Sequence, residues 1–168
     1  LTLSAADANA IKADATLGTS VSNTFLLVTA STIKDMALND LDAQTVAKAA
    51  KAVTVDTTAP TLKSAALDMN AGKLTLVFDE MIKLGVAVDA AKISVGTDIN
   101  DGNAIDLAGS TQSSTDASST EVVLSFSVEK LNTLKLDTTR AVEGSSFIVL
   151  GGGAVTDTSS QSNVKINR

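Results

Sequence analysis

No cysteine and no histidine occur among the 168 residues of the chain. Without cysteine a disulfide framework and thiolate chemistry are excluded, and without histidine the usual zinc ligand sets are excluded as well. The commonest general base and the Ser-His-Asp arrangement are also missing. The composition therefore weighs against the common classes of hydrolytic enzyme.

Aromatic residues are equally scarce, because the chain has no Trp and no Tyr, and its four Phe residues stand at positions 25, 78, 126 and 147. With 44% hydrophobic residues the chain can still form a packed core, which Ala, Val, Leu and Ile must fill. No apolar run approaches the roughly 20 residues that span a bilayer. The net charge is −6 without a basic cluster, so we expect no nucleic-acid partner, no anionic membrane surface and no membrane insertion.

Two segments show the period-two alternation of half-buried antiparallel strands. In "EVVLSFSV" the residues predicted to share one face are Val122, Leu124, Phe126 and Val128. In "GKLTLVFDE" they are Leu74, Leu76 and Phe78. We expect Leu74, Leu76, Phe78, Val122, Leu124 and Phe126 to line one interior. The turn "NAG" at 70–72 predicts a hairpin between residues 62–67 and 73–78.

Further strands are predicted at 24–29, 53–55, 92–95 and 146–150. Helical signals are short. Ser4 followed by Asp7 is a capping pattern and predicts a helix of about two turns. The Ala-rich stretch 42–52 suggests a second helix, with Asp42 as its N-cap. Polar loops separate these elements, which is typical of a β-sandwich.

Acidic and glycine-rich stretches provide the candidates for chemistry. Asp79 and Glu80 are neighbours in a strand and must point to opposite faces, so we interpret them as a solvated strand end. The glycine run 151–153 lacks the Lys-Ser/Thr and the helix of a phosphate-binding loop, so a flexible loop is the better interpretation. Calcium is the remaining alternative, either at "DINDGNAID" (98–106), which departs from the EF-hand pattern, or near Asp56. We assign no catalytic, cofactor-binding or metal-ligating residue.

The sequence repeats internally. "LTLSAADANAIK" at 1–12 aligns with "LSFSVEKLNTLK" at 124–135, so that Leu1 corresponds to Leu124, 123 residues later. "NTFLLVTASTIKD" at 23–35 aligns with "SSFIVLGGGAVTD" at 145–157, with Phe25 opposite Phe147, 122 residues later. One single-residue gap accounts for the change in spacing. The same order of strand, short helix and strand thus recurs.

The only proline, Pro60, lies at the junction of the repeat units in "VDTTAPTL". Proline fixes φ, cannot donate to a strand ladder and keeps the preceding residue extended, which suits a stiff passage between domains. By repeat phase, residues 1–57 correspond to the C-terminal half of one unit and residues 58–168 to one nearly complete unit. Half a sandwich cannot bury its inner face. Its apolar residues, among them Leu1, Leu3 and Ile33, must therefore be covered by more chain, by a neighbouring subunit or by residues 58–168.

The segments "VDTTAPTLKSAALD", "GKLTLVFDEMI", "LTLSAADANAIK" and "IKDMALN" resemble the Ig-like repeats of large bacterial and archaeal cell-surface proteins. The second unit departs from the pattern, with "TDTSSQSN" where the first has "KDMALND", and the first unit lacks the early strands. The resemblance implies an all-β fold of Ig-like antiparallel β-sandwich repeats with short helical insertions. It also implies an extracellular location in adhesins, surface-layer proteins or fibres.

We therefore expect a non-enzymatic structural building block of an extracellular surface assembly, such as a surface layer, fibre or sheath. The alternative is an adhesin module that binds a host or glycan ligand, although glycan sites usually offer an aromatic platform and this chain has no Trp or Tyr. Cofactors are expected to be absent, with calcium as the open alternative. The expected partners are copies of the chain or neighbouring repeats of a longer one.

Overall fold

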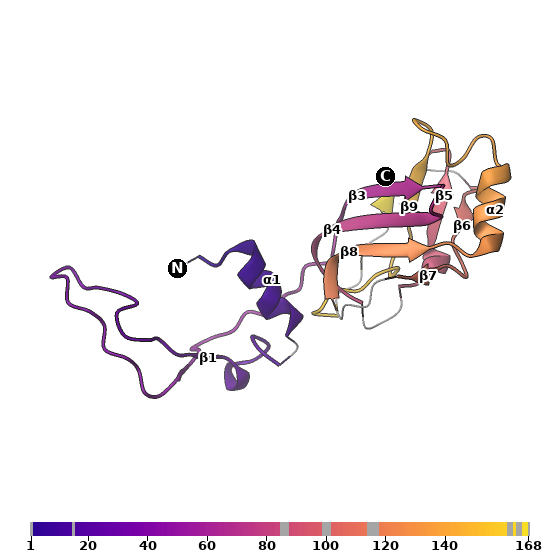
Figure 1. Cartoon of the computed structure of the whole chain (residues 1–168). Coiled ribbons are helices and arrows are strands. Elements are labelled where there is room, and N and C mark those ends of the chain that lie inside the picture. The colour runs from indigo at the N-terminus through magenta and orange to yellow at the C-terminus, as the bar shows by residue number, and fades with distance from the viewer. Residues whose placement is uncertain are drawn as a thin grey trace. The chain divides into compact units, whose positions relative to one another are not determined.

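The computed structural model describes residues 2–14, 16–84, 88–98, 102–113, 118–160, 163, 166 and 167. The chain divides into two compact units, Leu1–Asp56 and Thr57–Arg168, which are called unit 1 and unit 2 below (Figure 1). In the described part of the chain, three antiparallel sheets and two short α-helices make up the regular structure, together with two single-turn 3-10 helices. The fold is therefore β-rich with short helices, as predicted at that level of detail.

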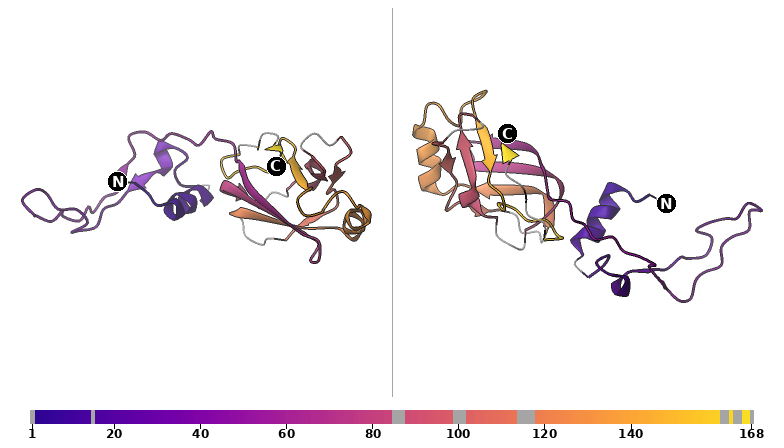
Figure 2. Two further views of the ribbon diagram at one scale, coloured as in Figure 1. Left: turned by 90° about the horizontal axis from the view of Figure 1, so that it is seen from above. Right: turned by 180° about the vertical axis from the view of Figure 1, so that it is seen from behind.

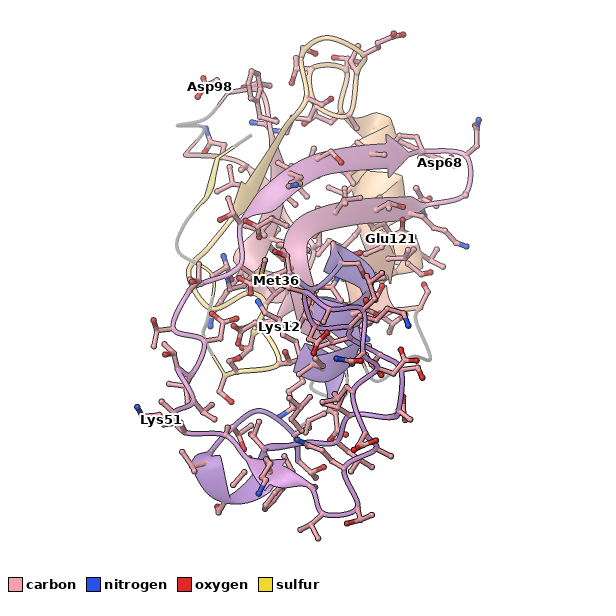
Figure 3. The ribbon with its side chains drawn as sticks, turned by 90° about the vertical axis from the view of Figure 1, so that its left-hand side faces the viewer. Lys12, Met36, Lys51, Asp68, Asp98 and Glu121 are labelled. Atoms are coloured by element: carbon pink, nitrogen blue, oxygen red, sulfur yellow. The ribbon has the colours of Figure 1, made fainter. Side chains whose placement is uncertain are left out.

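The first sheet of unit 2 has the order β3-β4-β8-β7. Its strands are β3 (Leu62–Asp68), β4 (Lys73–Lys83), β7 (Thr111–Gln112) and β8 (Ser118–Ser125). The predicted hairpin is confirmed, since β3 pairs with β4 from Leu62 to Asp68. Asp68 caps the turn by accepting hydrogen bonds from the backbone N–H groups of Asn70 and Ala71, and it lies where the two strands join (Figure 3).

The second sheet of unit 2 has the order β10-β9-β5-β6. Its strands are β5 (Ile93–Gly96), β6 (Ile105–Asp106), β9 (Phe147–Leu150) and β10 (Ile166–Asn167). The 3-10 helix η2 (Ala90–Lys92) leads into β5, and the helix α2 (Val128–Leu136) connects β8 with β9 (Figure 1). The predicted strands 92–95 and 146–150 correspond to β5 and β9.

The two sheets of unit 2 form separate layers (Figure 2). One hydrophobic cluster contains residues of both sheets. The first sheet contributes the alternate residues of β4 and β8, and the second contributes Ile93, Val95, Ile148 and Leu150. Leu74, Leu76, Phe78, Val122 and Leu124 are all buried, which confirms the predicted register. Since the side chains in this cluster are mostly branched aliphatics, the interior is packed with almost no aromatic surface.

The predicted strand around Phe126 is too long. β8 ends at Ser125, Phe126 is partly buried against the core, and Val128 is the first residue of α2 with 76% of its surface exposed. The strand stops because Ser127 caps the helix by accepting a hydrogen bond from the N–H of Lys130. A side-chain cap satisfies a helix-start N–H group, and here it overrides the alternating pattern.

Unit 1 contains the helix α1 (Ala5–Ala13), the 3-10 helix η1 (Val21–Asn23) and the short strands β1 (Phe25–Leu26) and β2 (Lys48–Ala49). The capped helix is confirmed, with Ser4 accepting from the N–H of Asp7. The helix predicted over 42–52 is wrong, because that stretch includes β2, which pairs with β1. Helix propensity of alanine is a weak signal that strand pairing can override.

The strand predicted at 24–29 shrinks to β1, and residues 53–55 form no strand. Leu1 lies outside the described residues. None of the described residues of unit 1 is buried. In this part of the chain the apolar side chains therefore gather no core of their own.

Candidate functional site

The inward face of β4 includes a carboxylate. Along this strand the buried residues alternate as Leu74, Leu76, Phe78, Glu80 and Ile82. Glu80 is only 7% exposed, whereas its neighbour Asp79 is exposed and accepts a hydrogen bond from the N–H of Thr61. The two acidic side chains do point to opposite faces, as predicted. The interpretation of both as a solvated strand end is wrong, because β4 continues to Lys83 and carries Glu80 into the interior.

Glu80 lies at an irregularity of the sheet. β4 and β8 pair up to Val77 opposite Glu121, and pairing resumes at Ile82 opposite Ser119. The residues of β4 between these points outnumber those of β8, which is the arrangement of a bulge. Bulges redirect side chains near sheet edges, so the position of Glu80 is set by the local backbone.

A second buried carboxylate lies next to Glu80. Asp157 is 1% exposed and forms an isolated antiparallel bridge with Ile82. The N–H of Lys83 donates to the carbonyl of Thr156 at 2.9 Å, which holds this segment alongside β4. Carboxylate oxygens of Glu80 and Asp157 lie within 4.8 Å of one another.

The loop that carries Asp157 is organised by Asn163, which is 2% exposed. The Asn163 side chain accepts from the N–H of Val155 at 2.9 Å and donates to the carbonyl of Gly151 at 3.0 Å. The glycine run 151–153 is a turn against η2, and the N–H of Gly151 donates to the carbonyl of Lys92 at 2.7 Å. A Cβ at Gly151 would come within 3.1 Å of that carbonyl, so the close approach of two backbones explains this glycine.

Two buried carboxylates this close repel each other when both are ionised, unless a hard cation lies between them, and they can also share a proton. Acid–base catalysis also requires access for a substrate. A cavity of about 490 Å³ in unit 2 is lined by residues of β3, the 141–146 loop and β9, and neither Glu80 nor Asp157 lines it.

The other calcium candidates have different surroundings. Ile99, Asn100 and Asp101 of the 98–106 loop lie outside the described residues. Asp106 lies on β6 and forms an ion pair with Lys130 of α2 at 2.9 Å, and this hydrogen bond is the main reason that the pKa of Asp106 lies below its usual range. Asp56, the last residue of unit 1, forms an ion pair with Lys12 at 2.6 Å.

The internal repeat is visible in the hydrogen bonds of the two helices. Ser4 and Ser127 cap helices of nine residues each. The C-caps are Asp14 and Asp137. Asp14 accepts from the N–H and hydroxyl of Thr16, and Asp137 accepts in the same way from Thr139, 123 residues later.

The segments after β1 and β9 are also alike. In unit 1 the N–H of Ser31 donates to the carbonyl of Leu41, and the N–H of Leu41 donates to that of Ile33. The corresponding bonds in unit 2, 122 residues later, join Gly153, Asn163 and Val155 in the same pattern. Both segments have left-handed residues at matching places, Ser31 with Gly153 and Leu38 with Ser160. The segments 31–41 and 153–163 are therefore called the paired loops.

No protein-family model, no curated protein and no solved structure matches this chain. No helix in the described part of the chain has the length and hydropathy needed to cross a bilayer.

Proposed function

We propose that the chain is a non-enzymatic structural building block of an extracellular surface assembly, made of tandem or polymerised Ig-like repeats. The observation that carries the proposal is the recurrence of one hydrogen-bonding pattern in both units, in the helix caps and in the paired loops. A chain that contains the same supersecondary pattern more than once is typical of an array.

The architecture of unit 2 supports an Ig-like sandwich. Two four-stranded antiparallel sheets share one aliphatic core, and short polar turns connect several of the strands. Face-to-face packing of antiparallel sheets is the arrangement of sandwich domains. The short helices α1 and α2 are then insertions that recur once per unit.

The role of a spacer or lattice component is supported by the kinds of charged and reactive side chains in the chain and by where they lie. Glu80 and Asp157 are buried, and the chain has neither histidine nor cysteine to form a reactive centre. The ion pair between Asp106 and Lys130 ties the second sheet to α2.

The proposal is tested on cells that produce the protein. Antibodies against unit 2 should label intact cells without permeabilisation, and isolated surface layers, fibres or sheaths should contain peptides from both units. The mass of the native material should exceed that of the 17.0 kDa chain, because the repeats would be joined or polymerised. Recovery of the protein only from the cytosol, as a monomer, would overturn the proposal. Specific binding on a glycan array would instead favour an adhesin.

A further inference from the structure

Apolar positions that are buried in unit 2 are exposed in unit 1. Leu26 is 62% exposed, and its counterpart Ile148 is 6% exposed. Ile33 is 61% exposed, and its counterpart Val155 is 3% exposed. On the helices, Ile11 is half-buried where Leu134 is 1% exposed. The two units therefore share a backbone pattern, and unit 1 lacks what covers that pattern in unit 2. The apolar side chains of Ile11, Leu26 and Ile33 are together called the open face.

The internal repeat shows what would cover the open face. In unit 2, Leu134, Ile148 and Val155 belong to one cluster with the inward residues of β3, β4 and β8. The inward residues that form this cover are Leu62, Leu74, Leu76, Val122 and Leu124, and all are 0% exposed. The cover is thus the inner face of an aliphatic antiparallel sheet.

The edge of β1 gives a second, independent indication. In unit 2, β9 lies between two strands, since it pairs with β10 on one side and with β5 on the other. In unit 1, β1 pairs with β2 on one side, and just beyond them the N–H of Gln44 donates to the carbonyl of Val28. Val28 and Gln44 correspond to Leu150 and Ile166, which pair between β9 and β10. Among the described residues of unit 1 no strand takes the place of β5. An open strand edge beside an exposed apolar surface is a template for strand addition.

We propose that the open face and the free edge of β1 are completed by a segment equivalent to residues 57–123, joined directly ahead of unit 1 in the same polypeptide. This segment, called the front half, contains β3 to β7 and most of β8. In unit 2 the front half closely precedes α2 in the chain, and α1 is the counterpart of α2 in unit 1, with the same serine N-cap and aspartate C-cap. Covalent connection also gives the front half a high effective concentration at the open face.

A second copy of the chain fits the open face less well. Each copy contains one front half, and the inner face of that front half is already covered within unit 2, where Leu74, Leu76 and Val122 are 0% exposed. If one copy gave its front half to another copy, the second sheet of its own unit 2 would be exposed. The inference rests on the proposed function, because it supposes repeat units in tandem.

The test is a chimera in which a second copy of residues 57–123 precedes residue 1 of the full chain. Because the natural chain has no cysteine, single substitutions report accessibility at chosen positions. Leu26→Cys and Ile33→Cys should react with a thiol reagent at least about tenfold more slowly in the chimera than in the 168-residue chain, since a buried group reacts only after local opening. Ala37→Cys is the matched position control, because its counterpart Ser159 is exposed in unit 2. Its labelling rate should not change.

A sequence control carries Leu74→Asp and Leu76→Asp in the added copy alone, which places charges on the covering face. Fast labelling at positions 26 and 33 should return in this control. If positions 26 and 33 are still labelled fast in the chimera without these aspartates, the inference is overturned. This holds whether or not the added segment is folded.

A shorter chimera, in which residues 57–123 are joined to residues 1–56 alone, should unfold cooperatively, and a non-cooperative transition counts against the inference as well. The results of the chimera experiments do not depend on whether the native protein lies at the cell surface, which the cell-labelling experiment tests separately.

Discussion

At the scale of single residues, the core of unit 2 depends on aliphatic side chains and one buried aromatic ring. Phe78 is 2% exposed on β4, whereas Phe126 follows the end of β8 and is only partly buried. Phe78→Ala should lower the free energy of unfolding by about 3–5 kcal/mol, because it leaves a cavity among packed neighbours. The same substitution at Phe126 should cost clearly less. Chemical denaturation of both variants measures the difference, and equal losses would contradict the described burial.

Glycines allow a similar matched comparison. Gly72, in the turn before β4, has a φ of +64°, and an added Cβ would come within 3.0 Å of the Leu131 side chain. Gly144 has a φ of +80° with nothing near an added Cβ, and Gly102 has neither a positive φ nor a close neighbour. A left-handed backbone costs an alanine about 1–2 kcal/mol. The loss of stability should therefore fall in the order Gly72→Ala, Gly144→Ala, Gly102→Ala. Any other order, measured by thermal unfolding, would show that strain and contact are wrongly assigned.

Glu80 and Asp157 lead to a prediction about calcium. Calcium takes six to eight oxygen ligands, and two carboxylates supply at most four. We therefore expect the melting temperature of the chain to be the same in EDTA and in about 1 mM calcium, a concentration near the affinity of extracellular calcium modules. A rise in melting temperature that Glu80→Gln abolishes would instead establish a cation site at this pair. Asp98→Asn serves as the control for binding at the 98–106 loop.

At the scale of helices and strands, the C-caps of α1 and α2 create an acid-sensitive feature. Hydrogen bonds from Thr139, and then from Arg140, hold the pKa of Asp137 far below its usual range. The folded state therefore prefers the ionised form. The stabilisation is complete above the unfolded pKa of about 3.9, and it is lost as the pH falls through the lower folded value.

Asp137→Asn should accordingly flatten the dependence of unfolding free energy on pH below about pH 4, with little change in that slope near neutrality. Asp14 is the matched position in unit 1, where a hydrogen bond from Thr16 also lowers the pKa. Asp14→Asn should leave the acid sensitivity of unit 2 unchanged. Acid titrations followed by near-ultraviolet absorbance of Phe or by NMR would detect the difference. An unchanged slope in Asp137→Asn would contradict the assignment.

The sequence predicted those elements whose pattern is set locally. Strict alternation in β4 and β8 and the turn at Gly72 identified the hairpin and most of its inward residues. The cap at Ser4 identified α1. The stretch 42–52 was misjudged because alanine favours a helix only weakly, and pairing with β1 decides its structure.

The acidic pair could be predicted only in part. The position of Glu80 in the inward series of β4 follows from period two once the strand is known to reach Lys83. Its neighbour Asp157 is distant in sequence, and the backbone pairing of its segment with Ile82 and Lys83 brings it near. A glutamate is so often exposed that sequence alone favours solvent.

At the scale of the whole molecule, the two units differ in how much buried apolar surface stabilises them. All members of the buried hydrophobic cluster lie between Leu62 and Val155, within unit 2. The described residues of unit 1 include none that is buried, and several large apolar side chains there are exposed, among them Phe25, Leu26 and Met36. Cooperative stability should therefore come from unit 2, because cooperativity in small domains follows from a shared core.

A chain that lacks residues 1–56 should consequently keep the main thermal transition of the full chain, with a melting temperature within about 4 °C, the shift that a change of 1 kcal/mol produces at this size. It should also associate less at high concentration, since the exposed apolar residues of unit 1 are removed. Calorimetry and sedimentation velocity on the two chains measure both effects. The matched control is the full chain with Leu26→Asp and Ile33→Asp, which should reduce association and leave the transition in place. A large loss of stability on deletion would mean that unit 1 contributes to the folding of unit 2, and the assignment of all cooperative stability to the cluster between Leu62 and Val155 would then be wrong.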